Sequence, residues 1–222
     1  MGYHRAGFEI LGVDINPQPH YPFPFVQMDA MDFLEAGFVA GDPLAFLRAT
    51  FGAIHASPPC QKWTRSQRQR KNADAHLDLV TPLRPLLEAT GLPYVIENVE
   101  YCDVLRDPIL LCGSMFDMDI QNHRLFETNW LLRNHDWPCR HGIWGKHRFP
   151  GTPQGSGKNP GASVVNRMAS GVTHELLASA MGIDWIPAPG KRPAKALSEA
   201  IPPAFTHYIG DQLMKHLGEV AA

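Results

Sequence analysis

Apolar and polar positions along the chain repeat with the period of strands in some segments and of helices in others. Short apolar runs bounded by turn residues predict strands at residues 8–15, 23–27, 52–57 and 93–99. Helical spacing appears at residues 43–50 and 74–90. Strands that alternate with helices predict an α/β fold with a mainly parallel sheet.

The helix predicted at 74–90 has the longest amphipathic pattern. Its apolar side consists of Leu77, Val80, Leu83, Leu86 and Leu87. Pro82 and Pro85 predict a kink in it.

The last third of the chain differs in pattern. Residues 134–161 are rich in Gly, Pro, His, Trp and Arg, which predicts an irregular insert. Helical spacing returns at 173–181 and at 202–217, and residues 187–193 separate these segments as a linker.

Polar or reactive side chains stand at the ends of the predicted strands. They are Asp14, Asp29, Cys60 and Glu97. Ligands of parallel α/β sheets bind beyond the carboxyl ends of the strands, so these four residues predict a shared site.

Composition narrows the class of protein. The chain has 222 residues, of which 44% are hydrophobic and 19% charged, so it can bury a core and disorder is excluded as its main state. No apolar run is long enough to span a membrane. We expect a monomer.

Charge is unevenly distributed, although the net charge is only −2. Residues 62–71 hold five cations and no acid, and residues 133–168 hold six cations against one acid. Residues 1–60 hold six acids and two cations. One side of the molecule is therefore suited to a polyanion, the alternative being two solvated basic loops.

Four scattered cysteines, Cys60, Cys102, Cys112 and Cys139, do not form a disulfide framework and indicate a reducing, intracellular compartment. Cys139 with His135, His141 and His147 fits no closed zinc set, so we expect no metal site.

The sharpest chemical signal is Ser57-Pro58-Pro59-Cys60-Gln61, where a rigid turn follows a strand and presents a thiol. A deprotonated thiol there is a nucleophile. Glu97-Asn98-Val99 ends the next predicted strand and offers a carboxyl group beside it.

These two segments resemble the DNA (cytosine-5)-methyltransferase family. Pro58-Pro59-Cys60-Gln61 is similar to its catalytic loop, and Glu97-Asn98-Val99 to its Glu-Asn-Val motif. His123-Arg124-Leu125-Phe126, with Gln121 before it, resembles the family's arginine motif in a degenerate form.

The resemblance implies a Rossmann-like, S-adenosylmethionine-dependent methyltransferase sheet with a small irregular target-recognition insert. It divides the chain into a catalytic core (1–126), the insert (127–170) and C-terminal helices that return to the core (171–222). Cys60 would add to C6 of a flipped cytosine, Glu97 would assist at N3, and Arg124 would hold the base or the intermediate.

The resemblance also implies binding residues. Asp14, Ile15, Asp29 and Pro58 would bind the cofactor S-adenosylmethionine. Double-stranded DNA would contact basic residues, namely Lys62, Arg65, Arg68, Arg70, Arg140, Lys146 and Arg148. Trp63 would either stack on a base or belong to the core.

One departure from the family pattern concerns its glycine-rich turn and the strand before it. The chain begins at Met1-Gly2, after the point where they are expected, and the absent strand would lie between the strands that end near Asp14 and Cys60. We interpret this as an upstream true start, with a cofactor-deficient relative as the alternative. A non-catalytic DNA-binding relative and an RNA cytosine-5 methyltransferase are the rival functions.

Overall fold

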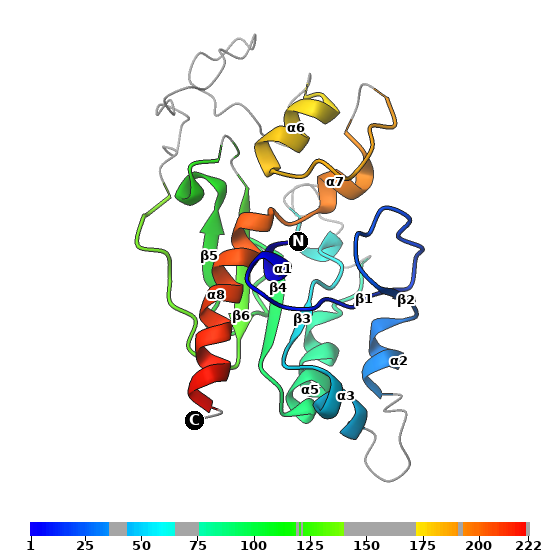
Figure 1. The fold of residues 1–222 in the computed structure, drawn as a ribbon, viewed down its shortest axis with the longest axis vertical. Helices are drawn as coiled ribbons and strands as arrows, with labels where there is room; N and C mark the ends of the chain where they lie inside the picture. Colours follow the sequence, from blue (N-terminus) through cyan, green and yellow to red (C-terminus); the bar gives the residue numbers. More distant parts are fainter. Residues whose placement is uncertain are drawn as a thin grey trace. The chain divides into compact units, whose positions relative to one another are not determined.

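The computed structural model describes residues 1–35, 44–64, 76–118, 120, 122–139, 172–190 and 193–220 (Figure 1). The helices are α1 (Gly2–Arg5), α2 (Ala30–Glu35), α3 (Ala45–Thr50), α5 (Val80–Thr90), α6 (His174–Met181), α7 (Lys195–Glu199) and α8 (Pro203–Val220), with short 3₁₀ turns η1 (Gln61–Trp63) and η3 (Gly113–Phe116). The strands are β1 (Gly12–Asp14), β2 (Phe25–Gln27), β3 (Ile54–Ala56), β4 (Tyr94–Val99), β5 (Ile109–Cys112) and β6 (His123–Thr128).

Two sheets form among the described residues. One has four strands in the order β3-β4-β6-β5, and the other pairs β1 with β2. β3 runs parallel to β4, whereas β6 runs antiparallel to β4. The predicted α/β class is confirmed, but the four-stranded sheet is mixed rather than mainly parallel. This arrangement is compatible with a Rossmann-like fold and is not specific to it.

β1 and β2 pair in parallel, with Asp14 opposite Gln27. The strand predicted at 8–15 is thus confirmed only over its last part, Gly12–Asp14. Among the described residues, no strand connects this pair by hydrogen bonds to β3.

The chain forms two compact units. The first comprises Met1–Glu9, Leu111–His123 and Asn134–Met214, and the second comprises Ile10–Leu110, Arg124–Arg133 and Lys215–Ala222. The predicted division at 126 and 170 follows chain order, whereas these units interleave along the sequence. Most of the predicted insert lies outside the described residues, so that division stays a prediction.

The core of the second unit lies between β4 and α5. Tyr94 and Ile96 of β4 pack with Val80, Leu83 and Leu87 of α5, and all five are at most 5% exposed. The helical spacing read from the sequence thus places the apolar side of α5 on the sheet (Figure 1).

α5 begins at Val80, six residues later than predicted. Asp78 Oδ1 accepts hydrogen bonds from the backbone N–H groups of Val80 (2.9 Å) and Thr81 (3.1 Å), and these bonds satisfy donors that have no partner within the helix. Leu77 precedes this cap and is 79% exposed, so its predicted place on the apolar side is wrong. The helix ends at Gly91, whose φ of 67° is the left-handed conformation that glycine adopts without strain.

In the first unit, α1 lies against α8 at glycines on both helices. A Cβ atom at Gly2 would collide with Thr206 and the Pro203 carbonyl, and one at Gly210 would lie 2.7 Å from the Ala6 Cβ. The absence of a side chain at both positions therefore permits the close approach. α8 confirms the predicted terminal helix and buries Phe205, Ile209 and Leu213.

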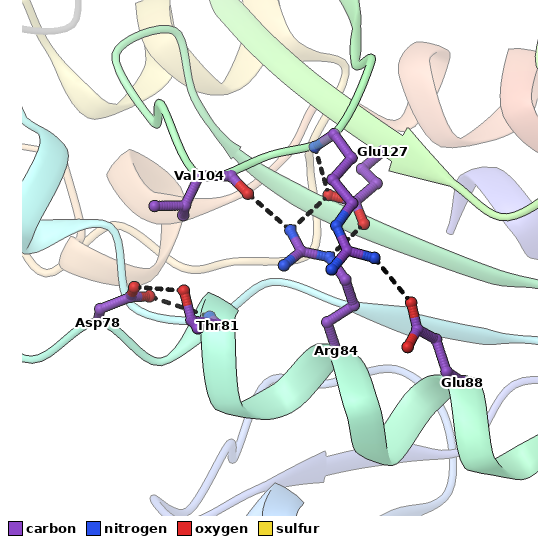
Figure 2. Close-up of polar contacts among 7 residues, drawn as sticks. Asp78, Thr81, Arg84, Glu88, Val104 and Glu127 are labelled. Carbon is purple, nitrogen blue, oxygen red and sulfur yellow. Dashed lines mark hydrogen bonds and ion pairs between the residues drawn. The ribbon is translucent and has the colours of Figure 1, made fainter.

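A buried ion pair joins α5 to β6 (Figure 2). Arg84 donates from Nε to Glu127 Oε1 (2.6 Å) and from Nη2 to Oε2 (2.8 Å), and its Nη2 also donates to the Val104 carbonyl (2.7 Å). The backbone N–H of Arg106 adds a further donor to Glu127 Oε2 at 2.8 Å. The side chains of Arg84 and Glu127 are only 5% and 2% exposed. The two opposite charges therefore compensate each other directly, because water has little access to them.

None of the described helices is both long and apolar enough to cross a lipid bilayer.

We expect Arg84→Met to lower the free energy of unfolding by about 3–5 kcal/mol, because it leaves the Glu127 carboxylate buried without its cation. Urea denaturation followed by circular dichroism measures this change. The matched control is Arg106→Met, which removes a pair with Glu88 whose side chains are 65% and 46% exposed. This control should cost less than about 1 kcal/mol. Equal losses in the two variants would contradict the structural role given to the buried pair.

Candidate functional site

The register of β4 and β6 places Glu97 and Arg124 on one face of the sheet. Glu97 is opposite Phe126 and Val99 is opposite Arg124. Side chains alternate between the faces of a strand, so Arg124 is the diagonal neighbour of Glu97 on the same face. Arg124 Nε lies 2.8 Å from Glu97 Oε1, and the two side chains are 12% and 9% exposed. Two residues that the sequence predicted separately therefore form one largely buried ion pair.

The Pro-Pro-Cys turn follows β3, which ends at Ala56. β3 and β4 are parallel, with Ala56 opposite Ile96, so the turn and Glu97 lie beyond the same end of this strand pair. Asn98 Nδ2 donates to the Pro58 carbonyl oxygen at 3.1 Å and so ties the turn to β4. Pro58, predicted as a cofactor residue, here anchors the turn.

Cys60 occupies the position before the 3₁₀ turn η1. Its φ of −93° and ψ of 1° lie in the sparsely populated bridge region, where many active-site residues are found. Its carbonyl oxygen accepts a hydrogen bond from Trp63 N at 3.0 Å, which holds the turn closed. The Cys60 side chain is partly exposed.

Two other cysteines differ from Cys60 in their surroundings. Burial raises the pKa of Cys102 to about 12 and that of Cys112 to about 11. Both are buried and, as metal-free side chains, remain neutral thiols at neutral pH. Partial exposure makes Cys60 a better candidate nucleophile than either of them.

Sequence reasoning missed His55, which lies on β3 three residues after the start of the predicted strand. It is opposite Val95 in the parallel pair and therefore shares a face with Glu97. Its ring contacts Phe126, with 6.4 Å between ring centroids, and its Nε2 lies 3.1 Å from Ser57 Oγ. Burial lowers the pKa of His55 to about 4, so the ring is neutral at neutral pH. A histidine in an otherwise apolar strand was the signal available in the sequence.

The residues predicted for the cofactor lie on β1 and after β2. Asp14 ends β1 and accepts hydrogen bonds from Asn16 N (2.7 Å), Asn16 Nδ2 (3.3 Å) and Gln18 Nε2 (3.1 Å). An ionised carboxylate has about four acceptor sites, so Asp14 keeps capacity for a hydroxyl donor. Ile15 beside it is 61% exposed, and a flat ring could cover this apolar side chain. Both residues fit a nucleoside.

Asp29 has a structural task in this fold. Its Oδ1 accepts hydrogen bonds from the backbone N–H groups of Met31 (2.8 Å) and Asp32 (3.3 Å), at the start of α2. This is the arrangement of an N-cap. The second carboxylate oxygen is the part of Asp29 that suits the predicted contact to an amino group.

The basic residues predicted for nucleic acid are only partly described. Lys62 is partly exposed on η1, two residues after Cys60. Trp63 is 4% exposed and packs in the core of the second unit, which decides between the two roles considered for it. The other predicted nucleic-acid contacts lie outside the described residues, namely Arg65, Arg68, Arg70, Arg140, Lys146 and Arg148. Gln121, from the predicted arginine motif, also lies outside them.

A cavity of about 520 Å³ lies within the first unit, between η3 and α8. Phe116, His135 and Tyr208 line it as an aromatic cluster, with ring centroids 4.7–5.8 Å apart. None of the residues predicted for catalysis or for the cofactor lines this cavity. It therefore does not bear on those predictions.

Comparison of the chain with known protein families finds no family that matches it. A search of curated proteins likewise finds no match.

We expect the free energy of unfolding to fall as the pH is lowered from about 6.5 to about 4 through His55, because the unfolded chain takes up a proton that the buried ring excludes. The loss is at most about 3 kcal/mol and is reduced by partial exposure of the ring. Denaturant unfolding at several pH values measures it.

The variant His55→Gln keeps a polar group near Ser57 and should flatten this dependence, whereas His20→Gln, on an exposed loop, should leave it unchanged. If His55→Gln retained the full dependence, another group would be its source.

Proposed function

We propose that this protein transfers a methyl group from S-adenosylmethionine to C5 of a cytosine in double-stranded DNA, with Cys60 as the nucleophile. The observation that carries the proposal is the convergence of three separate segments. Parallel pairing brings the Pro-Pro-Cys turn and Glu97 to one end of β3 and β4, and antiparallel pairing brings Arg124 within 2.8 Å of Glu97. The motifs of the resemblance thus coincide with a geometric cluster.

Cytosine C5 is a poor nucleophile, and the Cys60 thiolate would correct this by bonding to C6. As the S–C6 bond forms, electron density moves through the ring to C5, and N3 takes up a proton. A carboxyl group at N3 stabilises the protonated ring. Glu97 would take this role, and its ion pair with Arg124 would hold the carboxylate in a fixed orientation.

S-adenosylmethionine would supply an electrophilic methyl group and would leave as S-adenosylhomocysteine. The C5 carbon would then carry both this methyl group and its original proton. Loss of that proton to solvent would restore the C5–C6 double bond and expel the Cys60 thiolate, and release of the N3 proton would return the neutral base. Asp14 would hold the ribose hydroxyls, Ile15 would cover the adenine face, and the outer oxygen of Asp29 would accept from the adenine amino group.

The choice of DNA rests on charge and on access to the base. The cations of residues 62–71 follow directly after Cys60 and would neutralise phosphates around the reacting nucleotide. Cytosine C6 is shielded inside a duplex, so the base must leave the stack to reach the thiol. Lys62, which is partly exposed on η1, is the first cation of this basic stretch.

We expect Cys60→Ser to abolish methyl transfer from labelled S-adenosylmethionine to duplex DNA, because a serine hydroxyl is not ionised at neutral pH. Glu97→Gln should lower kcat about 10²–10⁴-fold, the usual contribution of a positioned acid or base. Cys102→Ala, at a buried cysteine that is not one of the cluster residues, should retain activity and serves as the control. Unchanged turnover in Cys60→Ser would remove this residue from the mechanism.

A parallel assay with RNA and a filter-binding assay with DNA distinguish the rival functions. Methylation of RNA alone would favour an RNA methyltransferase. Retention of DNA without any transfer would favour a non-catalytic DNA-binding protein. Either result would contradict the proposal.

A duplex that carries 5-fluorocytosine should trap the intermediate, because fluorine at C5 cannot leave as a proton and the S–C6 bond then persists. We expect a protein–DNA band that survives denaturing electrophoresis, and its absence with Cys60→Ser. Peptide mapping of the adduct would identify the modified residue. Trapping at any other cysteine would contradict the assignment of Cys60.

A further inference from the structure

Two thiols and an imidazole converge within the first unit, and neither thiol is the one used in the proposed reaction. Cys112 ends β5, His123 begins β6, and Cys139 lies in the segment that follows residue 134. The side-chain atoms that could bind a metal, one from each residue, all lie within 4.8 Å of one another. Three residues that span 27 positions of the chain, from Cys112 to Cys139, thus bring three donor atoms together.

The local backbone explains why the first two donors meet. Gly113 follows Cys112, and a Cβ atom at this position would collide with the Ile120 carbonyl. Only glycine therefore allows the chain after β5 to lie against the segment that enters β6. Met118 N donates to the Gly113 carbonyl at 3.1 Å and closes this short loop. After this loop the chain comes back toward Cys112, and His123 is the first residue of β6 at that point.

The spacing of the donors suits a tetrahedral ion. With zinc–sulfur bonds of about 2.3 Å and zinc–nitrogen bonds of about 2.0–2.1 Å, tetrahedral angles separate sulfur from nitrogen by about 3.6 Å and sulfur from sulfur by about 3.8 Å. His123 Nε2 lies 3.4 Å from Cys139 Sγ. The third donor atom, Cys112 Sγ, lies within 4.8 Å of the donor atoms of the other two residues, so small side-chain movements would complete the tetrahedral geometry.

A fourth residue supports the two sulfurs. Ser114 is fully buried, and its hydroxyl lies 3.3 Å from Cys112 Sγ and 3.5 Å from Cys139 Sγ. A hydroxyl donor near thiolates stabilises their negative charge and orients them, as outer-shell groups do at metal sites. If the two cysteines were only small apolar side chains in a core, a buried hydroxyl beside both sulfurs would have no such role.

We propose that Cys112, His123 and Cys139 bind a zinc ion. Two thiolates and one imidazole form a ligand set that zinc favours over magnesium or calcium, which take oxygen ligands. The fourth tetrahedral position is assigned to water. The proposal does not depend on the proposed methyl transfer.

The ion would have a structural role. It joins the end of β5 and the start of β6, which are neighbours in the sheet, to the segment at Cys139. His123 directly precedes Arg124, so the ion fixes the start of the strand that carries this arginine. The local spacing of Cys139 and its neighbouring histidines does not indicate a metal site, because the partners of Cys139 come from β5 and from the start of β6.

Elemental analysis of the full chain, purified under reducing conditions with zinc present, tests the proposal. We expect about one zinc per chain. The variants Cys112→Ser and Cys139→Ser should each lose most of the bound zinc, whereas Cys102→Ser and Cys60→Ser should keep it. The Cys60 variant also separates this proposal from the proposed function, because it should lose turnover and retain metal.

Cobalt substitution of the unaltered protein provides a readout that does not depend on variant folding. We expect thiolate-to-cobalt charge-transfer bands in the near ultraviolet together with intense visible bands of a tetrahedral site. No zinc uptake and no such bands in the folded protein would overturn the proposal. So would zinc retained by the double variant Cys112→Ser/Cys139→Ser, or a disulfide between these two cysteines in the reduced preparation.

Discussion

The structure depends most on the pairing of β4 with strands on both of its sides. β4 is parallel to β3 and antiparallel to β6, and its first five residues are buried. A shift of one residue in either register would turn every side chain of the shifted strand to the other face. The positions of Glu97 relative to Arg124, and of the Pro-Pro-Cys turn relative to Glu97, all follow from these two registers.

The same register explains why polar groups occupy both faces of β6. Arg124 lies on the face of Glu97, whereas Glu127 lies on the opposite face and is bound by Arg84 of α5. Both pairs are largely buried, so each charge needs its partner in place. One pair fastens a helix to the sheet and the other orients a candidate catalytic carboxylate. The strand thus links the stability of the second unit to the geometry of the site.

Sequence reasoning was most successful where the signal is local. The strand at 93–99, the terminal helix and the helix at 173–181 were predicted within a few residues, because apolar spacing and capping residues mark them. Leu77 was placed wrongly because its spacing fits the helix while Asp78, a capping residue, starts the helix later. β6 escaped prediction as a strand because its residues do not alternate between polar and apolar, and its two charged side chains are buried only through ion pairs with distant segments.

The amino-acid sequence by itself determined the α/β class and the presence of a strand-end thiol and carboxyl group, because periodicity and turn chemistry are properties of neighbouring residues. Only the tertiary structure decided that Arg124 pairs with Glu97, that Trp63 belongs to the core, and that Cys112, His123 and Cys139 converge. These are contacts between segments far apart in the chain. They follow from strand register and from close backbone approach at glycine, which no local pattern encodes.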